Sequence, residues 1–104
     1  MPFGLSQQVI DQIRGVLAQH PNLEEAIVYG SRAKGNYKTG SDIDLCFKGE
    51  ALDFATLARI AEELDQLPIP YLFDLSIFAT LDNPDLIAHI NRVGQVFYAK
   101  PNPK

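Results

Sequence analysis

The sequence predicts a fold that contains both helices and strands, α/β (α+β). In this predicted fold, helices cover one face of a small mixed β-sheet and leave the other face open. Three observations support this. The 104 residues, 46% of them hydrophobic and 21% charged, suit a single domain over residues 1–104. Short apolar runs alternate with segments whose apolar residues recur at helical spacing. Two of the strand-like runs carry aspartates, which a fully buried face would not tolerate.

The chain begins with a predicted helix over residues 7–19. Ser6 can cap its N-terminus, and Pro21 follows its end. Its apolar residues recur on one face: Val9, Ile10, Ile13, Val16 and Leu17. Residues 26–29 then form a continuous apolar run that ends at a glycine, which is typical of a buried strand.

A polar segment, residues 30–41, separates this strand from the next. Gly30 breaks the strand, and we expect Ser31 to cap a single helical turn that Gly35 closes. Backbone N–H groups at such a start point outward and favour an anion. Gly40 is expected to take a positive φ in the loop that follows.

The second predicted strand, residues 42–48, places two aspartates on one face. Because side chains alternate across a strand, Asp42, Asp44 and Cys46 share a face, and the core face carries Ile43, Leu45 and Phe47. Two carboxylates a few Å apart repel each other unless a cation lies between them. A divalent cation with oxygen ligands is the usual solution.

The third predicted strand, residues 71–78, contains an isolated aspartate. Asp74 shares a face with Leu72 and Ser76, which leaves Phe73, Leu75 and Ile77 to the core. A charge in a central strand is costly unless it is paired or binds a cation. If the second and third strands are neighbours, Asp74 completes a cluster with Asp42 and Asp44.

The remaining elements follow from caps and helix breakers. They are a helix over residues 54–66 capped by Asp53, a helix over residues 84–93 capped by Asn83, a short edge strand over residues 95–99 and a frayed tail over residues 100–104.

Composition narrows the classes of function. The net charge of −4 and pI near 4.9 disfavour autonomous binding of nucleic acid. No apolar run approaches the roughly 20 residues that span a bilayer, and the first residues lack the features of a signal peptide, so we expect no membrane association and a cytoplasmic location. Cys46 is the single cysteine, which excludes an internal disulfide and a thiolate zinc site.

The three aspartates suit a particular chemistry. Carboxylates from two adjacent strands can hold two Mg²⁺ ions, with substrate phosphate oxygens completing the coordination. Such a pair activates an attacking hydroxyl and neutralises a leaving pyrophosphate, which is nucleotidyl transfer. Gly30 and Ser31 would then grip the triphosphate, close to the positive charges of Arg32 and Lys34.

The segment GSRAKGNYKTGSDIDL, residues 30–45, resembles the signature of the DNA polymerase β type nucleotidyltransferases, with its Gly-Ser step, short loop and Asp-x-Asp. Its Ala-Lys-Gly and Ser-Asp-Ile-Asp-Leu resemble more narrowly the minimal nucleotidyltransferase (MNT) family. The similarity extends over nearly the whole chain, because the helix after the second strand and Asp74 fall where that family has them.

The resemblance implies a polymerase β palm-like fold and a set of site residues. It implies nucleotide contacts by Gly30 and Ser31, with Arg32, Lys34 and Ser41 as further candidates from the same segment. It implies catalytic and metal-binding roles for Asp42, Asp44 and Asp74, with two Mg²⁺ ions as cofactors and ATP as substrate.

The resemblance also implies a partner, a HEPN-type or substrate-binding four-helix protein. In toxin–antitoxin pairs of this family, the enzyme transfers AMP from ATP to a tyrosine of the HEPN toxin and so acts as its antitoxin. Two alternatives remain open: an antitoxin that masks its toxin without catalysis, and a transferase that acts on a small molecule such as an aminoglycoside.

Three other polar residues receive no role in this chemistry. His20 and His89 are interpreted as a helix-end and a helix-surface residue, because neither falls in a ligand or base pattern. Cys46 lies on the strand face that carries the aspartates, yet a free cysteine usually packs as a small apolar side chain.

Overall fold

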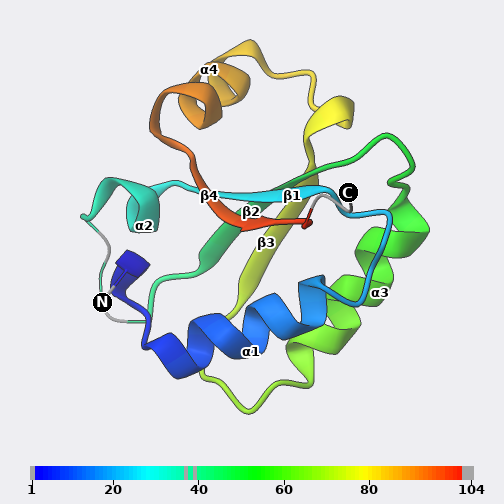
Figure 1. Ribbon diagram of the computed structural model, residues 1–104. Coiled ribbons are helices and arrows are strands. Elements are labelled where there is room, and N and C mark those ends of the chain that lie inside the picture. The colour runs from blue at the N-terminus through cyan, green and yellow to red at the C-terminus, as the bar shows by residue number, and fades with distance from the viewer. Residues whose placement is uncertain (1, 37, 39, 102–104) are drawn as a thin grey trace.

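The chain folds into a four-stranded sheet with helices on both of its faces. The computed structural model describes residues 2–36, 38 and 40–101. Figure 1 shows the sheet nearly edge-on, with α1 and α3 below it and α4 above it. In chain order the elements are η1 (Pro2–Gly4), α1 (Gln7–Leu17), β1 (Glu25–Tyr29), α2 (Ser31–Lys34), β2 (Ile43–Lys48), α3 (Phe54–Asp65), β3 (Phe73–Ile77), η2 (Phe78–Thr80), α4 (Pro84–Val93) and β4 (Gln95–Ala99).

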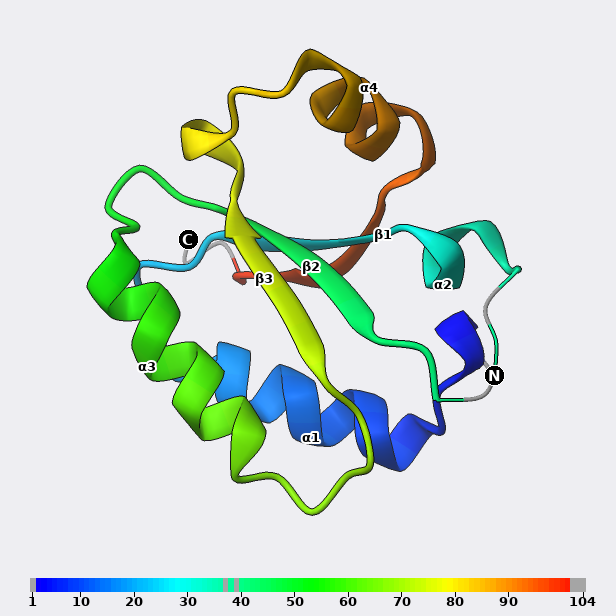
Figure 2. The same ribbon diagram turned by 180° about the vertical axis from the view of Figure 1, so that it is seen from behind.

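The strands are arranged in the order β3-β2-β1-β4, so β3 and β4 form the two edges. β1 pairs antiparallel with both β2 and β4, whereas β2 and β3 run parallel. Parallel strands need a crossover connection, and α3 supplies it between β2 and β3. Figure 2 shows these two strands side by side, with α3 leading from one to the other. The predicted mixed sheet is confirmed.

The main core lies between the sheet and the pair α1 and α3. Its fully buried members come from every layer: Leu5, Ile10, Ile13 and Leu17, then Val28, Leu45 and Phe47 from the strands, and Ile60 and Leu64 from α3. The predicted caps begin these helices. The Ser6 hydroxyl accepts a hydrogen bond from the Val9 N–H at 3.2 Å, and the Asp53 carboxylate accepts one from the Thr56 N–H at 2.8 Å.

We expected helices on one face of the sheet only, but α4 covers part of the second face. Ile90 of α4 packs there in a smaller apolar cluster with Ile27, Tyr29 and Cys46. β1 is the reason, because its residues are apolar on both faces and the main core can bury only one of them. The free cysteine therefore packs as a small apolar residue, as expected.

Element boundaries differ from the sequence prediction at the ends that concern function. β2 begins at Ile43, so Asp42 precedes the strand. The N-cap of α2 is Gly30, which makes Ser31 the first helical residue and not the cap. Gly35 and Gly40 have the expected positive φ values, 84° and 82°. Most of the predicted tail, residues 102–104, lies outside the described residues, as do positions 37 and 39.

None of the described helices combines the length and the hydropathy needed to cross a lipid bilayer.

Candidate active site on the second face of the sheet

Asp44 and Asp74 are direct neighbours on adjacent strands. In the parallel ladder between β2 and β3, Asp44 pairs with Asp74 and Cys46 pairs with Ser76. Paired residues of neighbouring strands point to the same face and lie roughly 4.8 Å apart in the hydrogen-bonding direction. Asp74 and Asp44, the second aspartate of the Asp-x-Asp, therefore lie on the same face of the sheet as expected.

Burial and neighbouring charge raise the pKa of Asp44. The main cause is partial removal of its carboxylate from water, and the carboxylates of Asp74 and Asp42 raise the pKa further. His89 acts in the opposite direction. Burial and the two neighbouring carboxylates together disfavour the ionised form of Asp44, and a bound cation would favour it.

Gly30 brings the Gly-Ser turn against this cluster. Its φ of 73° favours glycine, and a Cβ at this position would overlap with a carboxylate oxygen of Asp44. The start of α2 and the Asp44 carboxylate are consequently in contact distance. Because α2 has only four residues, its dipole is small. A phosphate bound here would depend on individual N–H groups and on the half-buried Ser31.

Arg32 does not occupy the position that the sequence suggested. The prediction gave it a phosphate contact, but its side chain is only 3% exposed and its guanidinium donates hydrogen bonds to the carbonyls of Ser41 and Phe3. A buried guanidinium with these partners is part of the loop's framework, and we assign it no phosphate contact.

The other two loop candidates differ in exposure. Lys34 is exposed at the end of α2. The hydroxyl of Ser41 accepts a hydrogen bond from the Lys38 N–H at 2.9 Å, so it also holds the loop.

Two further residues lie near the carboxylates: Tyr29, which the sequence analysis gave no site role, and His89, which it interpreted as a helix-surface residue. Tyr29 pairs with Asp44 in the ladder between β1 and β2. Burial raises the pKa of its phenol, and the charges of Asp74 and Asp44 raise it further. The ring of His89, from α4, meets the Tyr29 ring edge-on at 6.2 Å between centroids. Strand parity could have placed Tyr29 here, whereas His89 required the position of α4.

The donor set at this site suits a hard cation. Among the described residues, no three His, Cys, Asp or Glu side chains are arranged as a ready-made site for a metal ion. Asp44 and Asp74 nevertheless offer carboxylate oxygens on one face, and Asp42 is near enough for its charge to raise the pKa of Asp44. Mg²⁺ commonly uses a few carboxylates together with water and substrate oxygens. Their chemistry fits Mg²⁺ bound together with a nucleotide.

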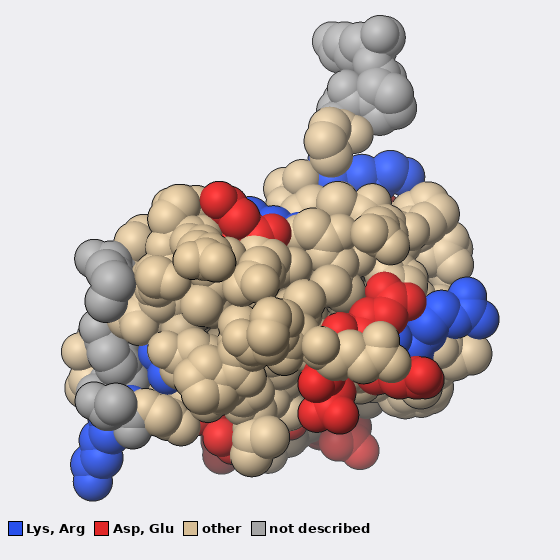
Figure 3. Space-filling view, turned by 90° about the horizontal axis from the view of Figure 1, so that it is seen from below, with Lys and Arg blue, Asp and Glu red and all other residues tan. Residues whose placement is uncertain are grey.

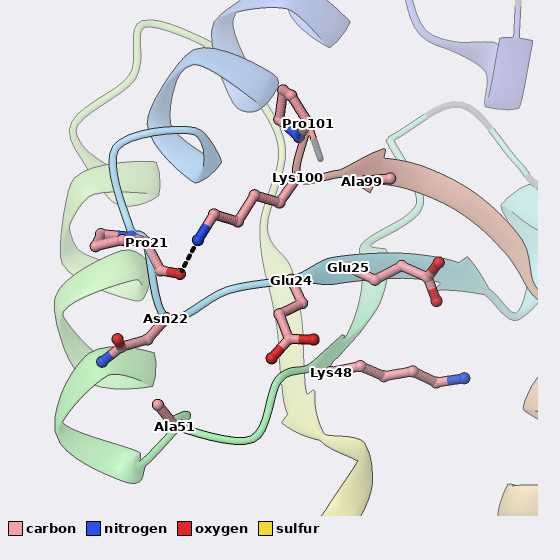
Figure 4. A pocket seen from close by; sticks show the side chains of 9 residues that line it. All are labelled: Pro21, Asn22, Glu24, Glu25, Lys48, Ala51, Ala99, Lys100 and Pro101. Carbon is pink, nitrogen blue, oxygen red and sulfur yellow. Dashed lines mark hydrogen bonds between the residues drawn. The ribbon is translucent and has the colours of Figure 1, made fainter. Parts of the chain in front are cut away.

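Two hollows on the surface differ in their distance from the candidate site residues. One, of about 590 Å³, lies at the opposite end of the β1 and β2 ladder, lined among others by Glu24, Glu25, Lys48 and Lys100, and it contains none of the candidate site residues (Figure 4). A groove of about 670 Å³ runs between α3 and the free edge of β3, and Asp42 lines part of it. Of the candidate carboxylates, Asp42 is the one that lines this groove.

Comparisons with known proteins identify a family and a shared fold. A family model described as "Polymerase beta, Nucleotidyltransferase" matches residues 11–102. No curated protein matches the chain by sequence.

Several solved structures share the fold. A toxin–antitoxin complex with AMP-PNP aligns with a TM-score of 0.70 and 20% identity over 88% of this chain and 73% of that chain. A tri-AMPylated Shewanella oneidensis HEPN toxin in complex with an MNT antitoxin gives 0.67 and 18%, over 92% and 74%. An MntA–HepT toxin–antitoxin pair gives 0.66 and 18%, over 91% and 74%. At these identities the likeness is one of fold.

The contact between Gly30 and Asp44 leads to a stability prediction. Gly30→Ala should destabilise the protein by roughly 2–4 kcal/mol, because it combines a strained φ with overlap against the carboxylate. Gly35→Ala is the matched control, since Gly35 has a similar φ of 84° but open space where a Cβ would lie. It should cost about 1 kcal/mol. Urea unfolding measures both, and equal losses would contradict the close approach.

A second prediction concerns charge. The pKa of Asp44 is higher in the folded than in the unfolded protein, so folding is more favourable when Asp44 is protonated. This contribution to stability is lost as the pH rises through the folded pKa, and ionised Asp44 lowers the stability at pH 7. Asp44→Asn should therefore raise the Tm of the metal-free protein at pH 7 by roughly 1–4 °C. The gain should shrink as the pH falls towards the ordinary aspartate value of 3.8.

Glu62→Gln, at an exposed position of α3, removes the same charge and should leave the Tm nearly unchanged. Mg²⁺ should stabilise the wild type more than Asp44→Asn. If Asp44→Asn lowers the Tm in chelator at pH 7, the electrostatic account is wrong.

Proposed function

The chain belongs to the polymerase β nucleotidyltransferase family, and on this premise we propose that it transfers AMP from ATP to a hydroxyl group of a HEPN-type partner protein. The acceptor is a tyrosine in this proposal, and the modification silences the partner, so that the chain acts as a cytoplasmic antitoxin. The observation that supports it most is the pairing of Asp44 with Asp74 beside Gly30, because it joins a carboxylate pair to a turn that can approach a phosphate closely.

The residues divide into two groups in this proposal. Gly30 and Ser31 hold the triphosphate of ATP, with Lys34 near enough to the turn to add positive charge. Asp42, Asp44 and Asp74 bind Mg²⁺, which when bound lowers the pKa of the acceptor hydroxyl and neutralises the departing pyrophosphate. Asp74, on the edge strand β3 and exposed, lies where an acceptor hydroxyl can reach it and can accept its proton.

The described relatives support a protein acceptor. One of the structures with this fold holds a tri-AMPylated HEPN toxin bound to its MNT antitoxin, and another holds a toxin–antitoxin pair with AMP-PNP. The same reaction in this chain remains our proposal, because the sequences are only about one fifth identical.

The groove beside β3 offers a surface for such a partner. Most of its lining residues are apolar or aromatic, and Asp42, Glu62 and Asp65 are also among them. Leu72 and Phe54, also part of the lining, are 68% and 63% exposed. Figure 3 shows acidic side chains gathered on the side of the helical face where α3 lies. An acceptor protein with apolar and basic side chains on its contact surface is complementary to this groove.

The central prediction concerns transfer itself. Incubation with ATP, Mg²⁺ and the HEPN-type partner should add AMP to a partner tyrosine, detected by mass spectrometry. Asp44→Asn and Asp74→Asn should each lower the rate by about 10²-fold or more, because each removes a metal ligand. A well-folded wild-type protein that leaves the partner unmodified would count against transfer.

Two further experiments separate the alternatives. An antitoxin that only masks its partner should still neutralise it after the combined change Asp42→Asn and Asp44→Asn, whereas an AMP-transferring antitoxin should not. A transferase for small molecules should label an aminoglycoside in the absence of any partner.

A further prediction tests the groove. Leu72→Glu should weaken partner binding roughly tenfold, because it removes an exposed apolar side chain on which apolar residues of the partner would pack. Val96→Glu is the control, since Val96 is 53% exposed on the opposite edge strand, β4. Binding measured by calorimetry should be unchanged in Val96→Glu, and ATP binding should be unchanged in both. Equal binding by the two variants would place the partner elsewhere.

A further inference from the structure

We propose that Arg32 is a positioning residue for Asp42, fixing the peptide group from which the Asp42 side chain extends. The inference rests on the proposed function and deepens it, because it assigns an indirect role at the same site to a residue whose guanidinium binds backbone carbonyls. Arg32 is almost fully buried, at 3% exposure, although arginine is seldom buried without specific partners.

The guanidinium joins three segments that are distant in sequence. Its Nε and Nη2 atoms both donate to the Ser41 carbonyl, at 3.1 and 2.7 Å. Its Nη1 atom donates to the Phe3 carbonyl at 2.8 Å. Its central carbon lies 5.0 Å from the centre of the Tyr71 ring, within the range of a cation–π contact.

Two donors on one carbonyl restrain the orientation of a peptide group. The Ser41 carbonyl and the Asp42 N–H belong to the same planar unit, so holding the oxygen also fixes the plane that leads into Asp42. Asp42 needs this restraint, because it is exposed and precedes β2. The first β2 amide to bond to the β3 side is that of Ile43, which donates to the Leu72 carbonyl at 2.9 Å.

The Arg32 side chain also connects the turn at Gly30 with the segment that leads into β3. Arg32 belongs to α2, whose first residue, Ser31, follows the turn at Gly30 that touches Asp44. Tyr71 leads into β3, the strand that carries Asp74. Arg32 therefore sets the position of the loop carboxylate relative to both the phosphate-binding turn and the strand carboxylates.

Lysine cannot reproduce this arrangement. The guanidinium fork presents several donors in one plane, whereas an ammonium group is a single point charge on a flexible stem. Lys at position 32 would keep the charge and lose the paired contact to Ser41. We therefore expect the Arg32→Lys variant to fold but to displace Asp42. Arg32→Gln should displace Asp42 further.

Arg14 provides a control with similar contacts at an exposed position. Its Nε atom donates to the Phe97 carbonyl at 2.8 Å, and its central carbon lies 5.3 Å from the Phe97 ring centre. It thus makes the same two kinds of contact, but between α1 and β4, away from the carboxylates. Arg14 is exposed and donates through one nitrogen, so Arg14→Lys reports what losing an arginine hydrogen bond and ring contact costs in stability away from the carboxylates.

The test uses two measurements on the wild type, Arg32→Lys, Arg32→Gln and Arg14→Lys. The first is the backbone amide NMR signal of Asp42 without metal or nucleotide. It should shift and broaden in both Arg32 variants and remain as in the wild type in Arg14→Lys. An Asp42 signal that is unchanged in Arg32→Gln and Arg32→Lys would overturn the proposal, whatever the protein's activity.

The second measurement is the Mg²⁺ concentration that gives half of the Mg²⁺-dependent rise in Tm in the presence of ATP. It should increase roughly tenfold to hundredfold in Arg32→Lys, the range seen when groups that orient metal ligands are changed. It should stay within twofold in Arg14→Lys. An equal increase in Arg14→Lys would mean that Arg32 contributes only to the general stability of the fold. A wild type that Mg²⁺ does not stabilise would contradict the proposed function, and the NMR result would still decide the role of Arg32.

Discussion

The parallel pairing of β2 with β3 is the constraint on which the candidate site depends. Its register sets Asp44 opposite Asp74, two like charges that repel each other at this distance. The apolar residues on the other face compensate for that repulsion, since Leu45 pairs with Leu75 over the main core and Phe47 with Ile77. A slip of one residue would move the aspartates into the core, so burial of one face specifies the placement of charge on the other.

The two faces of the sheet have different tasks. α1 and α3 bury the first face and provide most of the apolar contact area. α4 covers only part of the second face, through Ile90 and its neighbours, and leaves the carboxylates beside Tyr29 and His89 partly accessible. Partial cover makes charge–charge interactions at the site stronger than in open water while still admitting a ligand. The raised pKa of Asp44 reflects this environment.

Local rules predicted much of this arrangement. Ser6, Asp53 and Asn83 cap helices as their residue types indicate, and strand parity placed Asp44 and Asp74 on one face. The same rules failed for Arg32, because a charged residue in a polar loop normally remains solvated, and only the packing of three other segments around it produces its burial. They also failed for the second face, where the expected open surface is partly covered by α4.

The sequence by itself determined the main helices and strands, the caps of α1, α3 and α4, the alternation of acidic and apolar residues and the glycine at the turn, since these depend on neighbours a few residues away. Tertiary structure alone decided that β2 and β3 are adjacent and in register, that His89 lies over Tyr29, and that Arg32 bonds to Ser41 and Phe3. Each of these contacts joins segments that local backbone preference leaves independent. They form only when the burial of one shared core brings the segments together.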